Sequence, residues 1–133
     1  MGTFLAVREE SFDVLILLLT LLTTLFLQVL SNLANDYGDA ASGVDSQDRV
    51  GPERAVQSGK IHKNQMKRAL FVFSGLSFSS GLLLLLYVFP DQWSALLLFL
   101  AIGVAAIWAS IKYTVGNNPY GYAGFGDIFV LLF

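Results

Sequence analysis

The stretch VLILLLTLLTTLFLQVLSNLANDYGDAASGVD, residues Val14–Asp45, decides the fold of this chain. Its first two-thirds carry no charged side chain, and that run is long enough to cross a bilayer, which takes about 20 apolar residues. One amide and three carboxylates follow at once, those of Asn35, Asp36, Asp39 and Asp45. Ionisable groups at the edge of a hydrocarbon slab are energetically expensive and usually mark a functional site. The stretch therefore predicts a membrane helix with a polar site at one end.

The composition of the whole chain favours the same class. Of its 133 residues, 55% are hydrophobic and 14% are charged, and the mean hydropathy is +0.63. An ordinary globular domain is about 25% charged. The absence of cysteine excludes disulfides and thiolate metal sites. The N-terminus has neither the basic region nor the cleavage signature of a signal peptide. We predict an integral membrane protein whose surroundings are lipid and which has no nucleic-acid partner.

Three uncharged windows, residues 14–35, 69–90 and 93–111, predict full membrane spans. Two apolar stubs, 2–7 and 128–133, are too short to span. We expect an all-α integral membrane helical bundle, with residues 1–133 as a single partial membrane domain of three full transmembrane helices and two truncated ones. The alternative for the last stub is a short interfacial tail. An Asp-rich loop at 36–68 and a second loop at 112–127 would join the helices.

The basic residues predict the orientation, because they collect in cytoplasmic loops. Only Arg8 lies on the side opposite to the Asp-rich loop. We therefore expect a multi-pass protein of the cell inner (cytoplasmic) membrane with the Asp-rich loop in the cytoplasm. The residues that share this side are Arg49, Arg54, Lys60, Lys63, Lys67, Arg68 and Lys112.

Polar residues follow one stripe of the first predicted span, with Gln28, Asn32, Asn35 and Asp39 at helical spacing. Such a stripe suggests the wall of a cavity, whereas the alternative for Gln28 and its neighbour Ser31 is hydrogen bonding between helices. Asn35 and Asp39 are four residues apart, so their oxygens point to one place.

Asp45 can return to that place through the flexible turn before it, and Asp36 lies one position from the stripe. Oxygen ligands of this kind suit Mg²⁺, which often shares them with substrate phosphates. We predict Asn35, Asp36, Asp39 and Asp45 as metal ligands. The alternative is a set of solvated loop acids.

Two further groups are candidates for substrate contacts. Arg49 and Arg54 are fork donors suited to phosphate oxygens, and Gly51-Pro52 between them lets them converge. A basic loop is also what the orientation rule alone produces. The second loop, rich in Gly and Tyr, could cover an aromatic ligand, the alternative being interfacial anchoring. Its candidate residues are Lys112, Tyr113, Tyr120 and Tyr122.

The motif Asn35-Asp36-x-x-Asp39, with the following Arg49 and Arg54, resembles the first Asp-rich motif of the UbiA superfamily of membrane prenyltransferases. The strings LSNLANDYGDAASGVD, DRVGPERAVQSG, QMKRAL and YTVGNNPYGYAGFGDI are similar to the branch of that superfamily that acts on 1,4-dihydroxy-2-naphthoate in menaquinone biosynthesis. The resemblance covers nearly the whole chain, from about Leu15 to the end.

The resemblance implies an enzyme that transfers a prenyl group from polyprenyl diphosphate, bound through Mg²⁺, to 1,4-dihydroxy-2-naphthoate with loss of CO₂. Asp39, Arg49 and Arg54 would then act on the diphosphate. The chain departs from the superfamily pattern in two ways. Gly43 stands where a third acid is expected, with Asp45 as the nearest substitute, and a second Asp-rich motif is absent. We expect a fragment holding half of the metal site and inactive alone.

Three rival interpretations remain at this point. The acceptor could be another aromatic compound. A phosphatidyl-alcohol transferase would need an Asp-Gly-x-x-Ala-Arg pattern, which this chain lacks. A non-enzymatic metal or ion transporter could use Asp36 and Asp39 as pathway ligands, but it would need ligands deep in the membrane, where this chain has no charge.

Overall fold

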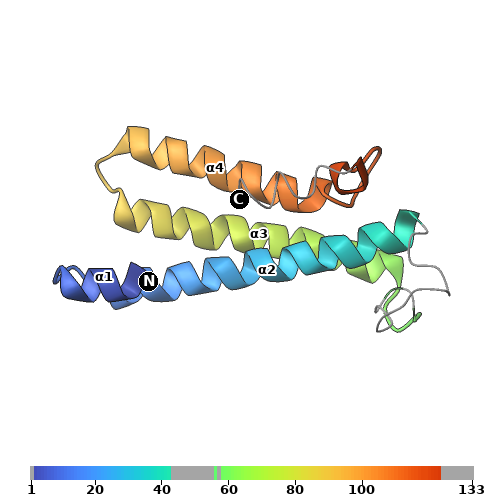
Figure 1. The fold of residues 1–133 in the computed structure, drawn as a ribbon, viewed down its shortest axis with the longest axis horizontal. Helices are drawn as coiled ribbons and strands as arrows, with labels where there is room; N and C mark the ends of the chain where they lie inside the picture. Colours follow the sequence, from blue (N-terminus) through green and yellow to red (C-terminus); the bar gives the residue numbers. More distant parts are fainter. Residues whose placement is uncertain (1, 43–55, 57, 124–133) are drawn as a thin grey trace.

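The computed structural model describes residues 2–42, 56 and 58–123. All of the regular structure in these residues is helical (Figure 1). Three of the helices are long and apolar enough to cross a membrane, which confirms the predicted all-α membrane fold. The elements in chain order are α1 (Gly2–Arg8), α2 (Val14–Ser42), α3 (Lys63–Val88), α4 (Trp93–Lys112) and the 3₁₀ helix η1 (Tyr120–Ala123).

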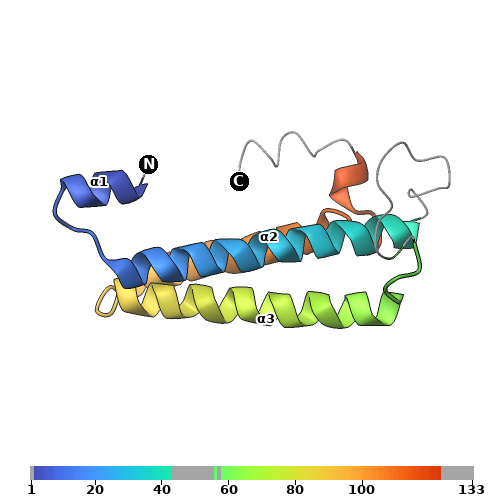
Figure 2. The same ribbon diagram turned by 90° about the horizontal axis from the view of Figure 1, so that it is seen from below.

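The three long helices run up, down and up beside one another (Figures 1 and 2). This topology brings the end of α2, the start of α3 and the end of α4 together at one end of the bundle, which we call the Asp-rich end. At the opposite end a tight turn joins α3 to α4, where the Phe89 amide donates to the carbonyl oxygen of Leu85 at 2.9 Å. The short helix α1 turns back beside the first turns of α2 (Figure 2).

The buried core of the bundle lies near the Asp-rich end. Leu30, Ala34 and Leu70 form it where α2 meets α3, and Phe26 packs edge-on against Phe73 at 6.1 Å between ring centroids. Much of the remaining apolar surface is exposed, as expected where lipid replaces protein contacts. Half-buried side chains that flank the core are Leu33, Tyr37, Phe73, Ile107, Ile111 and Val115.

A polar seam adds to the packing of α2 against α3. The Thr23 hydroxyl donates to Ser80 Oγ at 3.1 Å, and Ser77 and Ser80 are both buried. Small residues and hydroxyl pairs of this kind let membrane helices approach closely.

Asp13 caps the start of α2 at the opposite end. Its Oδ1 accepts the amides of Leu15 at 2.7 Å and Ile16 at 3.1 Å, and its Oδ2 accepts the hydroxyl of Tyr87 at 2.9 Å. These donors satisfy helix-terminal amides and link α2 to α3. The Ile16 amide first, and then the Tyr87 hydroxyl, lower the pKa of the Asp13 carboxyl below its ordinary value.

Two element boundaries differ from those expected from hydrophobicity. Helix α2 continues past the first apolar window, which ends at residue 35, to Ser42, and α3 begins at Lys63, before the second window, so residues 36–42 and 63–68 are helical rather than loop. Residues 36–42 contain no proline, and packing against the 113–123 segment supports them. The stub at 2–7 lies within the short helix α1, and the stub at 128–133 lies outside the described residues.

Candidate functional site

The last two turns of α2 carry the predicted ligands Asn35, Asp36 and Asp39. Because this segment is helical, Asn35 and Asp39 lie on neighbouring turns of one face, as their spacing predicted. Both contact the same partner, the segment 113–123 that follows α4.

Thr114 anchors that segment to α2. It is buried, and its hydroxyl donates to the carbonyl oxygen of Ala34 at 2.8 Å while lying 3.3 Å from Asn35 Oδ1. Gly38 makes this approach possible, since a Cβ placed there would lie 2.4 Å from the Thr114 carbonyl oxygen. Any side chain at position 38 would push the segment away from the helix.

The Asp39 carboxylate is buried against the same segment. Its Oδ1 accepts the hydroxyl of Tyr122, which belongs to η1 and lies 83 residues further along the chain. Ser42 Oγ donates to the Tyr122 hydroxyl oxygen at 3.3 Å. Ser42 Oγ also lies 3.1 Å from the Asp39 carbonyl oxygen, so Asp39 is held by contacts from both its own helix and a distant turn.

Asp36 has a different environment. Its Oδ1 is buried and has no hydrogen-bond partner within the part of the chain that the structure describes. A buried carboxylate oxygen without a donor is costly, because it has lost its water and gained nothing in exchange. Such an orphan is what a cation site would leave in a structure drawn without its ion.

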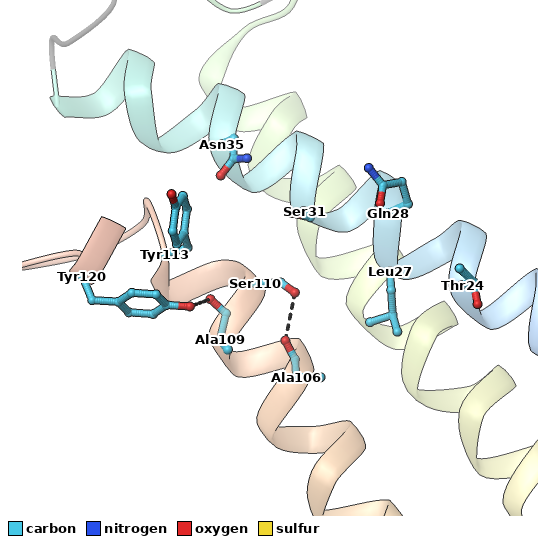
Figure 3. A pocket seen from close by; sticks show the side chains of 10 residues that line it. All are labelled: Thr24, Leu27, Gln28, Ser31, Asn35, Ala106, Ala109, Ser110, Tyr113 and Tyr120. Carbon is cyan, nitrogen blue, oxygen red and sulfur yellow. Dashed lines mark hydrogen bonds between the residues drawn. The ribbon is translucent and has the colours of Figure 1, made fainter. Parts of the chain in front are cut away.

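A groove of about 600 Å³ opens between α2 and α4, with Asn35 at its Asp-rich end (Figure 3). Gln28 and Asn35 of the predicted polar stripe line it from α2, whereas Asn32 and Asp39, the other two members, do not. Its lining residues are Thr24, Leu27, Gln28, Ser31, Asn35, Ala106, Ala109, Ser110, Tyr113 and Tyr120.

Two tyrosines close the groove at the Asp-rich end. The rings of Tyr113 and Tyr120 meet edge-on at 5.4 Å, and the Tyr120 hydroxyl donates to the carbonyl oxygen of Ala109 at 2.6 Å (Figure 3). Burial first, and then the neighbouring Tyr113, raise the pKa of Tyr120 above its ordinary value. The groove thus offers an apolar floor, hydroxyl and amide groups, and an aromatic wall.

The remaining predicted site residues lie either outside the groove lining or outside the described residues. Lys112 donates to the carbonyl oxygen of Asn117 at 2.6 Å, within its own loop, and does not line the groove. Tyr122 contacts Asp39 and likewise lies outside the groove lining. The predicted roles of Asp45, Arg49 and Arg54 fall outside the described residues. Within the described ranges, no three His, Cys, Asp or Glu side chains gather to hold a metal.

The sequence analysis did not predict several of the residues that the structure places at the site. Thr114 and Ser110 are ordinary polar residues near a helix end, and nothing local marks their contacts. Gly38 offered one clue, since a glycine amid helical polar residues indicates a close approach of another backbone.

This arrangement of membrane helices and acidic helix end matches a known class. The chain belongs to the UbiA prenyltransferase family, whose sequence model matches residues 1–133.

Individual relatives make the comparison more specific. The chain is 51% identical over 132 residues to a 1,4-dihydroxy-2-naphthoate octaprenyltransferase of Escherichia coli (strain K12), covering 99% of this chain and 42% of the relative. It is 47% identical to the protein of the same name from Haemophilus influenzae, over 95% of this chain and 41% of that protein. A third, from Bacillus subtilis (strain 168), is 33% identical over 97% of this chain and 39% of that protein. The chain thus spans about two-fifths of the length of these relatives. No solved structure matches significantly.

Proposed function

We propose that the full-length protein carrying this chain transfers a polyprenyl group from polyprenyl diphosphate to 1,4-dihydroxy-2-naphthoate, a step in menaquinone biosynthesis. The observation that carries the proposal is the end of α2, where Asn35 and Asp39 contact the 113–123 segment beside a groove with an aromatic wall, and where Asp36 Oδ1 is buried without a donor among the described residues. The names of the relatives supply the acceptor and the octaprenyl group, and the diphosphate donor is part of the proposal.

The donor set fits Mg²⁺. Asn35, Asp36 and Asp39 present only oxygen atoms, and the orphaned Oδ1 of Asp36 lacks a donor among the described residues. These three would hold the ion together with Asp45, whose placement the structure does not describe. When bound there, Mg²⁺ would neutralise the charge that grows as diphosphate departs.

The residues around the groove would bind and orient the acceptor. Its rings would lie against Tyr113, with the hydroxyl of Ser110 and the amide of Gln28 within the same groove. Holding the acceptor carbon near the first carbon of the prenyl chain would supply the proximity that the reaction needs. The carbon–oxygen bond to diphosphate then breaks, a carbon–carbon bond forms at the ring, and CO₂ leaves. Arg49 and Arg54 would take diphosphate oxygens.

The site would face the cytoplasm. The support for this orientation is the collection of basic residues on the side of the Asp-rich end, against Arg8 alone on the other. We place the protein in the cell inner membrane, where it would draw both the prenyl donor and the acceptor to one face.

A transfer assay on the full-length protein tests the proposal. Octaprenyl diphosphate, 1,4-dihydroxy-2-naphthoate and Mg²⁺ are supplied, and prenylated product is measured for the unchanged protein, Asp36→Asn and Asp39→Asn. Each substitution removes a charged ligand of the Mg²⁺ that would neutralise the departing diphosphate, so we expect each to lower the rate at least about 100-fold. Asp91→Asn, in the exposed turn at the opposite end, is the matched control and should keep the full rate.

Two outcomes would contradict the proposal. Near-normal transfer by both Asp36→Asn and Asp39→Asn would remove these residues from the site. Transfer to a different aromatic acceptor in competition, with none to 1,4-dihydroxy-2-naphthoate, would keep the reaction class but reassign the acceptor. An ion transporter would need charged ligands deep in the membrane. Helix α2 has no carboxylate between Val14 and Asn35, so the described residues give that alternative no support.

A further inference from the structure

Tyr122 makes a contact that neither the groove nor the predicted ligand set explains. Its ring is 43% exposed, yet its hydroxyl donates to Oδ1 of the buried Asp39. We propose that Tyr122 is a positioning residue, which holds the Asp39 carboxylate in the orientation that a divalent cation requires. This inference rests on the proposed function, because it takes Asp39 as a cation ligand.

The backbone around Tyr122 is held tightly enough for such a role. The Gly121 amide donates to the carbonyl oxygen of Tyr113 at 3.0 Å, and a Cβ on Gly121 would lie 2.6 Å from that oxygen. The left-handed φ of 96° at Gly116 turns the chain back towards α2. Thr114 and Gly38 then fix the start of the segment against the helix. The Tyr122 hydroxyl therefore arrives from a braced turn.

The contact has a definite consequence for a metal ligand. An aspartate carboxylate can rotate about two side-chain bonds, and Mg²⁺ demands near-octahedral geometry, so a misdirected oxygen binds poorly. A hydrogen bond to one oxygen selects one orientation before the cation arrives. Hydrogen bonds of this kind to ligating groups typically contribute 10- to 100-fold to metal affinity or activity (order of magnitude).

The same chemistry occurs at the opposite end of the bundle and provides a matched control. There the Tyr87 hydroxyl donates to Asp13 Oδ2 at 2.9 Å, in a cap that has no place in the proposed site. Tyr87→Phe removes a tyrosine-to-aspartate hydrogen bond just as Tyr122→Phe does. A general loss of stability should affect both variants, whereas an effect on cation binding should appear in Tyr122→Phe alone.

The test measures cation binding directly on the full-length protein. Mn²⁺ is the probe, supplied with inorganic pyrophosphate, and free Mn²⁺ is quantified by electron paramagnetic resonance. We expect Tyr122→Phe to raise the Mn²⁺ dissociation constant about 10- to 100-fold and Tyr87→Phe to leave it unchanged. In transfer assays, the Mg²⁺ concentration for half-maximal rate should rise by a similar factor in Tyr122→Phe, with the rate recovering at saturating Mg²⁺.

A second variant keeps the test decisive if Tyr122→Phe does not fold. Ser42→Ala removes the Ser42 contact to the same hydroxyl, and we expect it to weaken Mn²⁺ binding about threefold, the effect of one neutral hydrogen bond. Unchanged Mn²⁺ affinity in the folded variants would overturn the inference. So would a lower rate at saturating Mg²⁺ with an unchanged half-maximal concentration, because that pattern means a substrate contact or a packing role.

Failure of the proposed function would look different. If the unchanged protein binds Mn²⁺ with pyrophosphate but transfers no prenyl group, the function is wrong, while the Mn²⁺ affinities of the variants still decide the role of Tyr122.

Discussion

At the scale of single residues, Tyr120 links the groove to the helix that forms one of its walls. Its hydroxyl donates to the carbonyl oxygen of Ala109 near the end of α4, which also accepts the Tyr113 amide at 3.0 Å. Its ring packs against Tyr113 on the side of the groove. The phenol must stay protonated to donate this hydrogen bond.

This requirement predicts that the Tyr120 hydroxyl loses its proton at a higher pH than an ordinary tyrosine, because its pKa is raised. Because burial raises the folded-state pKa of Tyr120 above 10.0, the stabilisation due to its proton is fully present below that pH and is lost as the pH rises through the folded-state pKa. We expect the tyrosinate absorbance of the unchanged protein, minus that of Tyr120→Phe, to titrate above pH 10.0. A difference that titrates at or below this value would contradict the assigned burial.

The sequence predicted some of these residues and could not have predicted others. The sequence predicted that Asn35 and Asp39 lie on one face of a helix, because four residues make about one helical turn. The hydrogen bond from Tyr122 to Asp39 could not be predicted from the sequence, since it depends on the path of the whole 113–121 segment. The hydrogen bond from Lys112, at the end of α4, to the Asn117 carbonyl oxygen could not be predicted either, since it depends on the local path of the backbone, and the substrate contact predicted for Lys112 stays a prediction.

At the scale of elements, the site depends on how the 113–123 segment lies on the end of α2. The hydrophobic windows predicted the three long helices well, because membrane spans require long uncharged runs. They placed the end of α2 too early, since hydrophobicity does not record where a helix stops once it leaves the apolar layer. Tertiary contact through Thr114 and Tyr122 supports the additional turns.

Gly38→Ala tests this contact between elements. The added methyl would collide with the Thr114 backbone at 2.4 Å, so we expect a stability loss of about 1–3 kcal/mol and a displaced segment. Trypsin should cleave faster after Lys112, and thermal unfolding should begin at a lower temperature. Gly75→Ala is the control, because a Cβ there meets nothing within 4 Å. Equal cleavage rates for the two variants would show that the close approach is absent.

At the scale of the whole molecule, the up-down-up topology gathers every described candidate residue at one end of the bundle (Figure 1). The turn at 89–92 and the Asp13 cap lie at the other end. The membrane would then separate the acidic site from the Asp13 cap, and the direction of insertion decides which compartment supplies the substrates.

Labelling of introduced cysteines checks the predicted orientation. The 133 residues contain no cysteine, so a new thiol here reports its own position against a background set by the unchanged protein. In intact cells, a membrane-impermeant maleimide should label Asp91→Cys and not Lys60→Cys, and permeabilising the inner membrane should expose Lys60→Cys. The reverse labelling pattern would show that the protein is inserted in the opposite orientation.

The account's central claim is that a prenyl diphosphate binds at the Asp-rich end, between α2 and the 113–123 segment. A photoreactive prenyl diphosphate carrying a diazirine near its head group tests this claim most directly, with the attachment sites in the full-length protein located by mass spectrometry. We predict attachment within residues 24–42 and 106–123, increased by Mg²⁺ and suppressed by unlabelled octaprenyl diphosphate. Attachment in this chain confined to the turn at 89–92 or to α1, or attachment indifferent to both Mg²⁺ and competitor, would contradict the account.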